Sequence, residues 1–166
     1  RCGIPRGIAG PGHHRADTSP LTTPLGEREN FLLLPARAWG NKNHARLIAG
    51  VRILREHDPT LRLVLTGGAL ASLGPLPEWV DVRGVVPAEE LRWLYRHARA
   101  LVFPSLYEGF GLPPLEAMAA GCPVVSSNAG SLPEICGDAA VFFDPYDPSD
   151  LARAVMDAAR RHGDLQ

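Results

Sequence analysis

From residue 31 onward, the hydrophobic positions of this chain alternate between two kinds of segment. Short, nearly continuous apolar runs are typical of strands buried on both faces of a parallel sheet. We expect such strands at 31–34, 61–65, 80–86, 101–103, 123–125 and 141–143. The longer segments between them repeat their apolar residues every three or four positions, which is the spacing of one helical face. This alternation predicts an α/β fold, a Rossmann-like doubly wound parallel sheet with right-handed crossovers.

Polar residues mark where some of these helices begin. Asn41 or Asn43 can cap a first helix that runs to about His57. A last helix is expected to begin at Pro148, with Asp147 as its cap. The helix that follows the third strand is expected to bury one face, made of Leu91, Leu94, Tyr95 and Ala98.

The segment 103–125, FPSLYEGFGLPPLEAMAAGCPVV, carries the strongest candidate chemistry. It is expected to contain a strand end, a glycine turn, a short helix ended by Gly121, and the start of the next strand. Pro113 and Pro114 suit the first turn of that helix, where a missing N–H costs nothing. Its apolar face is expected to comprise Leu115, Met118 and Ala119. A turn that leads into a helix N-terminus presents free N–H groups and a positive dipole end, which favour an anion such as phosphate.

Two carboxylates accompany this turn. Glu108 lies in the turn and Glu116 in the first turn of the helix, eight positions later. An ionised carboxylate only accepts hydrogen bonds, so the pair suits a ligand rich in hydroxyl groups. Taken singly, Glu116 could merely favour the helix end and Glu108 could be a solvated loop charge. Phosphate and hydroxyl recognition together suggest a nucleotide sugar.

Residues 108–116, EGFGLPPLE, followed by AMAAGCPVV, closely resemble the donor-binding signature of retaining GT-B glycosyltransferases, glycosyltransferase family 4. The resemblance implies the C-terminal, donor-binding half of a GT-B fold, with the two glutamates forming its EX7E motif. It implies that Glu108 faces the transferred sugar as the catalytic residue and that Glu116 meets the ribose hydroxyls. It also assigns donor binding to the backbone of the turn at Gly109, Phe110, Gly111 and Leu112.

Further donor-binding residues are expected in the loops that follow the first three strands. Arg37 and Lys42 lie after the first strand, and Lys42 is the only lysine in a chain with 16 arginines. The plain alternative is a surface pair near a helix start, whereas the family resemblance implies that both bind the donor diphosphate. Gly67 lies at the carboxyl end of the second strand, where open α/β sheets bind ligands, and Val86 ends the third.

Composition narrows the function classes. Hydrophobic residues make up 45% of the chain and charged residues 21%, which is ordinary for a folded α/β domain. A net charge of -1 indicates no nucleic-acid partner, and no apolar run is long enough to span a bilayer. Cys2, Cys122 and Cys136 are an odd number without CxxC spacing, which favours reduced thiols and a cytoplasmic location. His13 and His14 lack companions at metal-ligand spacing, so no metal is expected.

The chain begins at Arg1 and ends at Gln166, just after a helical pattern, so we expect a fragment of a longer protein. Residues 1–30 have the composition of a linker or the tail of a preceding N-terminal domain. Residues 31–166 are then a nucleotide-sugar-binding domain, truncated at its C-terminus. The preceding domain would bind the acceptor and make any peripheral membrane contact, and the fragment alone is expected to be inactive.

The leading hypothesis is the donor half of a retaining hexosyltransferase, with mannosyl transfer in polysaccharide or glycan synthesis as one candidate. The donor substrate is a nucleotide diphosphate sugar, and neither a cofactor nor a metal is expected. A non-catalytic nucleotide-sugar-binding module and a nucleotide-sugar epimerase remain alternatives. Hydrolysis by paired carboxylates is another, since a glycosidase needs two carboxyls about 5–5.5 or 6.5–9.5 Å apart.

Overall fold

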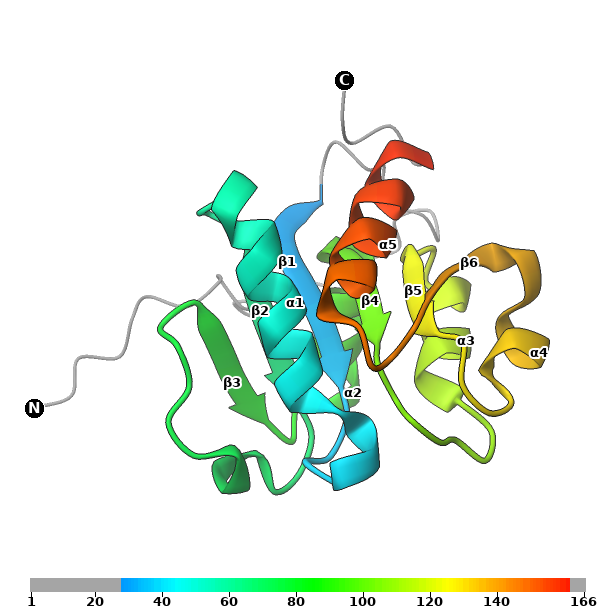
Figure 1. The fold of residues 1–166 in the computed structure, drawn as a ribbon. Helices are drawn as coiled ribbons and strands as arrows, with labels where there is room; N and C mark the ends of the chain where they lie inside the picture. The colour runs from blue at the N-terminus through cyan, green and yellow to red at the C-terminus, as the bar shows by residue number, and fades with distance from the viewer. Residues whose placement is uncertain (1–27, 162–166) are drawn as a thin grey trace, which may run out of the picture.

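The computed structural model describes residues 28–161, which form a six-stranded sheet with helices on both faces (Figure 1). The strands are β1 (Glu29–Pro35), β2 (Arg62–Thr66), β3 (Val80–Gly84), β4 (Ala98–Phe103), β5 (Val124–Ser127) and β6 (Ala140–Phe143). Their order across the sheet is β3-β2-β1-β4-β5-β6, and every neighbouring pair is parallel. The predicted fold class is confirmed, although β1 begins two residues before the expected start.

Five α-helices connect or follow these strands in the described part of the chain. They are α1 (His44–His57), α2 (Ala88–His97), α3 (Leu112–Ala119), α4 (Leu132–Cys136) and α5 (Pro148–Arg161). Short 3-10 turns occur at η2 (Gly40–Lys42), η3 (Leu70–Leu73) and η4 (Gly137–Ala139). Helices α1 and α5 pack together on one face of the sheet, in front in Figure 1, while α2 and α3 pack together behind it. Right-handed crossovers require this division, because the strand order reverses direction between β1 and β4.

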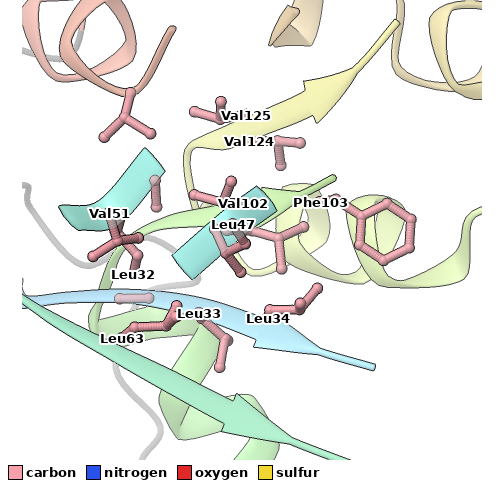
Figure 2. Close-up of a cluster of buried hydrophobic side chains, with 14 of the residues drawn as sticks. Leu32, Leu33, Leu34, Leu47, Val51, Leu63, Val102, Phe103, Val124 and Val125 are labelled. Carbon is pink, nitrogen blue, oxygen red and sulfur yellow. The ribbon is translucent and has the colours of Figure 1, made fainter. Parts of the chain in front are cut away.

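The core is centred on β1, which lies between β2 and β4. The four central residues of β1, Phe31–Leu34, are completely buried, as expected for a strand covered on both faces. Figure 2 shows Leu47 and Val51 of α1 among side chains of β1, β4 and β5, including Val102. This packing fixes the strand ends, and therefore the positions of the loops that follow them.

Helix α3 buries a different face from the one expected. Pro114 and Ala117 are buried, and Met118 packs against the core as expected, but Ala119 is exposed, so the predicted inner face is wrong at Ala119 and missed Pro114 and Ala117. The cause is the preceding turn, where Gly111 has a left-handed φ of 66° and lies under Leu132. That turn sets the rotation of the helix and places small residues against the sheet.

Helix ends follow the predictions in part. Helix α1 ends at His57, and Asp147 Oδ1 accepts a 2.8 Å hydrogen bond from the Ser149 N–H at the start of α5, both as expected. Ala98 begins β4, so its assignment to the preceding helix is wrong. Asn43 occupies the N-cap position of α1, but with a left-handed φ of 57° and without a side-chain capping bond.

The side chain of Asn43 instead joins three loops at the carboxyl edge of the sheet. Its Nδ2 donates to the carbonyl oxygens of Pro104, at 3.1 Å, and Pro145, at 2.8 Å. Asn41 adds a second link, because its carbonyl accepts a 2.8 Å bond from the Leu106 N–H and its Nδ2 donates to the Tyr107 carbonyl. The loops after β1, β4 and β6 therefore form one connected edge, along the bottom of Figure 1.

Between residues 28 and 161, no helix combines the length and the hydrophobicity that crossing a bilayer requires. Cys122 and Cys136 are free and buried, in agreement with a packing role. Cys2, His13 and His14 lie outside the described residues.

Candidate functional site

Lys42 and Glu108 are brought together by loops that follow the two central strands. Lys42 ends η2 after β1, Glu108 lies after β4, and the Lys42 Nζ donates a hydrogen bond to Glu108 Oε1. Their side chains are only 14% and 11% exposed, and Nζ also lies 5.4 Å from the centroid of the Phe103 ring. The strand order reverses between β1 and β4, which is where open α/β sheets bind their ligands.

This ion pair is mostly buried, but both side chains keep some exposure to solvent. Each partner neutralises a charge that would be costly to leave unpaired in such a setting. An anionic ligand can compete with Glu108 for the ammonium group, since phosphate and carboxylate are both charge-assisted acceptors. The arrangement therefore suits a cation that changes partner when an anion arrives.

Arg37 lies on the same loop and faces a different neighbour. Its guanidinium is 5.5 Å from the centroid of Trp39, and a Cβ added at Gly68 would come within 3.2 Å of its Nε. Arg37 is exposed and forms no ion pair with any residue in the range 28–161. It is thus a second cation on this loop that remains accessible to an anion.

Gly67 has a structural task at this edge. Its φ is +123°, and a Cβ there would lie 2.6 Å from the Ala36 carbonyl oxygen. Its N–H donates a 2.7 Å hydrogen bond to the Gly84 carbonyl. The contacts join the ends of β1, β2 and β3, so any role in donor binding would come in addition to this packing.

The turn before α3 exposes Gly109, Phe110 and Leu112, whereas Gly111 is buried. Pro113 and Pro114 have no N–H, so Gly111 and Leu112 supply the free donors of the first turn, and no side chain caps them. Gly109 has open space around the position of a Cβ, and Phe110 is 64% exposed. The N–H groups and the helix dipole together favour an anion here.

Glu116 has another kind of partner. The buried hydroxyl of Tyr95, on α2, donates a 2.9 Å hydrogen bond to Glu116 Oε2. Burial, and then the bond to the carboxylate, raise the pKa of Tyr95, so its hydroxyl keeps its proton. The sequence predicted Tyr95 as a packing residue, which it is, but its hydrogen bond was missed. The available indication in the sequence was the hydroxyl of Tyr95, the one polar group on a helix face that is otherwise apolar.

A cavity of about 370 Å³ lies between α2 and α3, with Glu116 in its wall. Its lining residues are Ala88, Leu91, Arg92, Tyr95, Arg96, Glu116, Ala119 and Ala120. Small and apolar side chains thus share the wall with one carboxylate, one hydroxyl and two arginines, a mixture of apolar and polar groups that fits a small organic ligand. Val86 is half-buried in the connection from β3 to α2, just before the part of α2 that lines this cavity.

No cluster of three or more His, Cys, Asp or Glu residues with metal-binding geometry occurs between residues 28 and 161. His44, the first residue of α1, was not singled out by sequence reasoning. It is only 3% exposed, and burial lowers its pKa, with a smaller contribution from the nearby Lys42 charge. His44 is therefore neutral near pH 7 and lies close to the site.

Comparison with known proteins identifies the family. Residues 18–162 match the profile described as Glycosyl transferases group 1. The chain belongs to this family. Its fold is accordingly a Rossmann-like α/β fold of the kind found in GT-B glycosyltransferases.

Individual relatives agree with that assignment. The O-antigen chain mannosyltransferase B of Escherichia coli is 48% identical over 87 residues, 52% of this chain and 23% of that protein. The O-antigen chain mannosyltransferase RfbU of Salmonella typhimurium is 30% identical over 138 residues, covering 78% of this chain and 38% of that protein. The sucrose-phosphate synthase structure from Thermosynechococcus elongatus is 28% identical with a TM-score of 0.67, covering 85% of this chain and 38% of that one. The chain therefore spans well under half the length of these relatives.

Proposed function

We propose that this chain is the donor-binding part of a glycosyltransferase that transfers a hexose from a nucleotide diphosphate sugar with retention of configuration. Mannose is the first candidate for the hexose, because the two O-antigen relatives named above are mannosyltransferases. The observation that carries the proposal is the Lys42–Glu108 pair at the carboxyl edge. It places a candidate phosphate-binding cation and a candidate sugar-binding carboxylate in direct contact.

The diphosphate is assigned to the cations and the start of α3. Arg37 is free of ion pairs within the described residues, and Lys42 has only an exchangeable one. The N–H groups of Gly111 and Leu112 add donors and the positive end of the helix dipole. These groups would stabilise the charge that develops on the leaving diphosphate.

Glu108 is assigned to the transferred sugar. When Lys42 turns to a phosphate, the carboxylate oxygen that it holds becomes available to accept a sugar hydroxyl. The same carboxylate would then favour positive charge that develops at the sugar ring, and we do not propose that it acts as a nucleophile. Donor binding would in this way free the Glu108 carboxylate to contact the transferred sugar.

The nucleoside is assigned to the cavity between α2 and α3. Glu116 would accept hydrogen bonds from the ribose hydroxyls, and the apolar wall formed with Leu91 would contact the rest of the nucleoside. Backbone groups at Val86 and Gly67 would complete the donor site. We further propose that the acceptor is bound by another part of the full protein, in the cytoplasm, and that any membrane contact is made there.

Isothermal titration calorimetry of this chain with GDP, UDP and dTDP, and with GDP-mannose, tests the proposal. We expect one of the diphosphates to bind, with the same affinity in the presence of EDTA, because two cations and a helix start serve the phosphates. Loss of binding on chelation would contradict the metal-independent part. No binding of any nucleotide would contradict the donor-site assignment itself.

The same chain should not transfer sugar to an added acceptor, since the acceptor site is assigned elsewhere. Release of the nucleoside diphosphate from its sugar nucleotide can be followed by chromatography with and without acceptor. Sustained, acceptor-dependent turnover by residues 1–166 alone would show that this part of the proposal is wrong.

A further inference from the structure

Tyr95 makes a contact that packing alone does not require. Its ring is buried on the inner face of α2, at 3% exposure, and its hydroxyl reaches across to α3 and donates to Glu116 Oε2 at 2.9 Å. Both residues line the cavity between the two helices. A phenylalanine would fill the same volume, so the hydroxyl itself needs an explanation.

The hydroxyl holds one half of the carboxylate. Glu116 Oε2 is committed to Tyr95, whereas Oε1 accepts no hydrogen bond from the described part of the chain. An untethered glutamate has three side-chain torsions to restrict when it binds a ligand, and this restriction costs affinity. Because Tyr95 is rigid and buried, that ordering is already present before a ligand arrives.

We propose that Tyr95 is a positioning residue that holds the Glu116 carboxylate so that the site prefers ribonucleotides to 2′-deoxyribonucleotides. The inference rests on the proposed function in one respect, the assignment of Glu116 to the ribose. A ribose offers two neighbouring hydroxyl donors, and a 2′-deoxyribose offers one. A fixed acceptor discriminates between them, because the ribonucleotide offers its oxygen a hydroxyl donor that the 2′-deoxyribonucleotide lacks. A mobile carboxylate can instead accept a hydrogen bond from water, so it discriminates less between the two kinds of nucleotide.

Tyr95→Phe tests this proposal by removing the hydroxyl and keeping the ring. The affinities of the wild-type chain and the variant for GDP and 2′-deoxy-GDP, and for UDP and 2′-deoxy-UDP, would be measured by calorimetry. We expect a wild-type preference for the ribonucleotide of about tenfold, the size of one hydrogen bond to a charged group. In Tyr95→Phe the ratio should fall below about threefold, mainly through weaker ribonucleotide binding.

Tyr146→Phe is the matched control. Tyr146 is 64% exposed in the loop before α5, and it makes no contact with the cavity between α2 and α3. Its substitution should leave the ribonucleotide preference unchanged. If Tyr95→Phe weakens both members of each pair equally, Tyr95 only packs and the proposal is overturned.

Glu116→Asp provides a second test that spares the interior. The residue is exposed on α3, so the fold should tolerate the change, while the shorter side chain withdraws the carboxylate from the intact Tyr95. The ribonucleotide preference should narrow as in Tyr95→Phe, and an unchanged ratio would overturn the proposal. If the wild-type chain binds none of the four nucleotides, the proposed function fails and this inference falls with it. If it binds them without a ribonucleotide preference, this inference alone fails.

Discussion

Two glutamates eight positions apart have opposite kinds of partner. Glu108 is neutralised by the charge of Lys42, which comes from the loop after β1. Glu116 is held by the neutral hydroxyl of Tyr95, which comes from the buried face of α2. An ionic partner can be attracted away by a ligand phosphate, whereas the neutral Tyr95 hydroxyl carries no charge for a phosphate to attract. We therefore interpret Glu108 as a carboxylate that loses its ion pair when the donor binds. Glu116, in contrast, already has its binding orientation before the donor arrives.

The difference also follows from where each partner is anchored. Lys42 ends a short 3-10 turn, and its long flexible side chain keeps many conformations within reach. Tyr95 is fixed in the interior by its ring. Within one short segment, the tertiary structure thus gives Glu108 a partner that can be exchanged and gives Glu116 a partner that stays in place.

The largest expected effect comes from Lys42→Met, which removes the exchangeable partner. Loss of a charged contact to phosphate should weaken nucleoside diphosphate binding by about 1.5–3 kcal/mol. The unpaired Glu108 should also lower the free energy of unfolding by about 1–3 kcal/mol, because its carboxylate is 11% exposed. Calorimetry and urea denaturation measure the two effects.

Two further variants sharpen that result. Adding Glu108→Gln to Lys42→Met should restore most of the stability without restoring binding, since no unpaired charge remains. Arg52→Met is the control, because Arg52 is an exposed cation of α1 that makes no ion pair within the described residues. Equal loss of binding in Arg52→Met would mean that only net charge matters.

Next in size is the contrast between the two glutamates themselves. Glu116→Gln should weaken binding of both the free diphosphate and the sugar nucleotide by about 1.5–3 kcal/mol, because a charged acceptor of the ribose is lost. Glu108→Gln should not weaken binding of the free diphosphate and should slightly strengthen it, because Lys42 no longer has to leave an ion pair to reach the phosphates. In the full-length enzyme it should mainly lower the transfer rate, since its contact is assigned to the sugar. Equal effects of the two substitutions on binding of the free diphosphate would contradict this division of roles.

The smallest expected effect is a pH dependence confined to the Lys42 side. Burial lowers the pKa of His44 below its ordinary value of 6.5, and Lys42 lowers it further. The unfolded chain therefore takes up a proton on His44 before the folded chain does. Stability from this residue is complete above pH 6.5 and is lost as the pH falls from 6.5 to the folded pKa.

Urea denaturation of the wild type and His44→Gln at pH 7.5 and 5.5 measures this dependence. The variant should show the smaller decrease on acidification, because it lacks the titrating group. The Tyr95 hydroxyl stays protonated across this range, so Tyr95 should not contribute to the dependence. An identical decrease in both proteins would assign the acid sensitivity to other groups.

Much of the fold was predictable because its signals are local. A parallel strand covered on both faces must be apolar throughout, and the wholly buried run at 31–34 shows this pattern. The short helix after the glycine turn was recognised from its prolines and Gly121. Its buried face was not, because the rotation of α3 depends on the turn at Gly111, where a Cβ would lie 3.0 Å from the side chain of Leu132, 21 positions later in the sequence.

The candidate site divides in the same way. The sequence by itself determined the alternation of strands and helices, and the turn with its two glutamates, because each depends on neighbours within a few positions. Only the tertiary structure decided that Lys42 pairs with Glu108, 66 positions away, and that Tyr95 holds Glu116, 21 positions away. Both contacts depend on the order of strands across the sheet and on the packing of α2 against α3. The physical reason is that a polar side chain bonds to the partner that the packed core brings within hydrogen-bond distance. The spacing of residues along the sequence does not determine that distance for residues far apart in the chain.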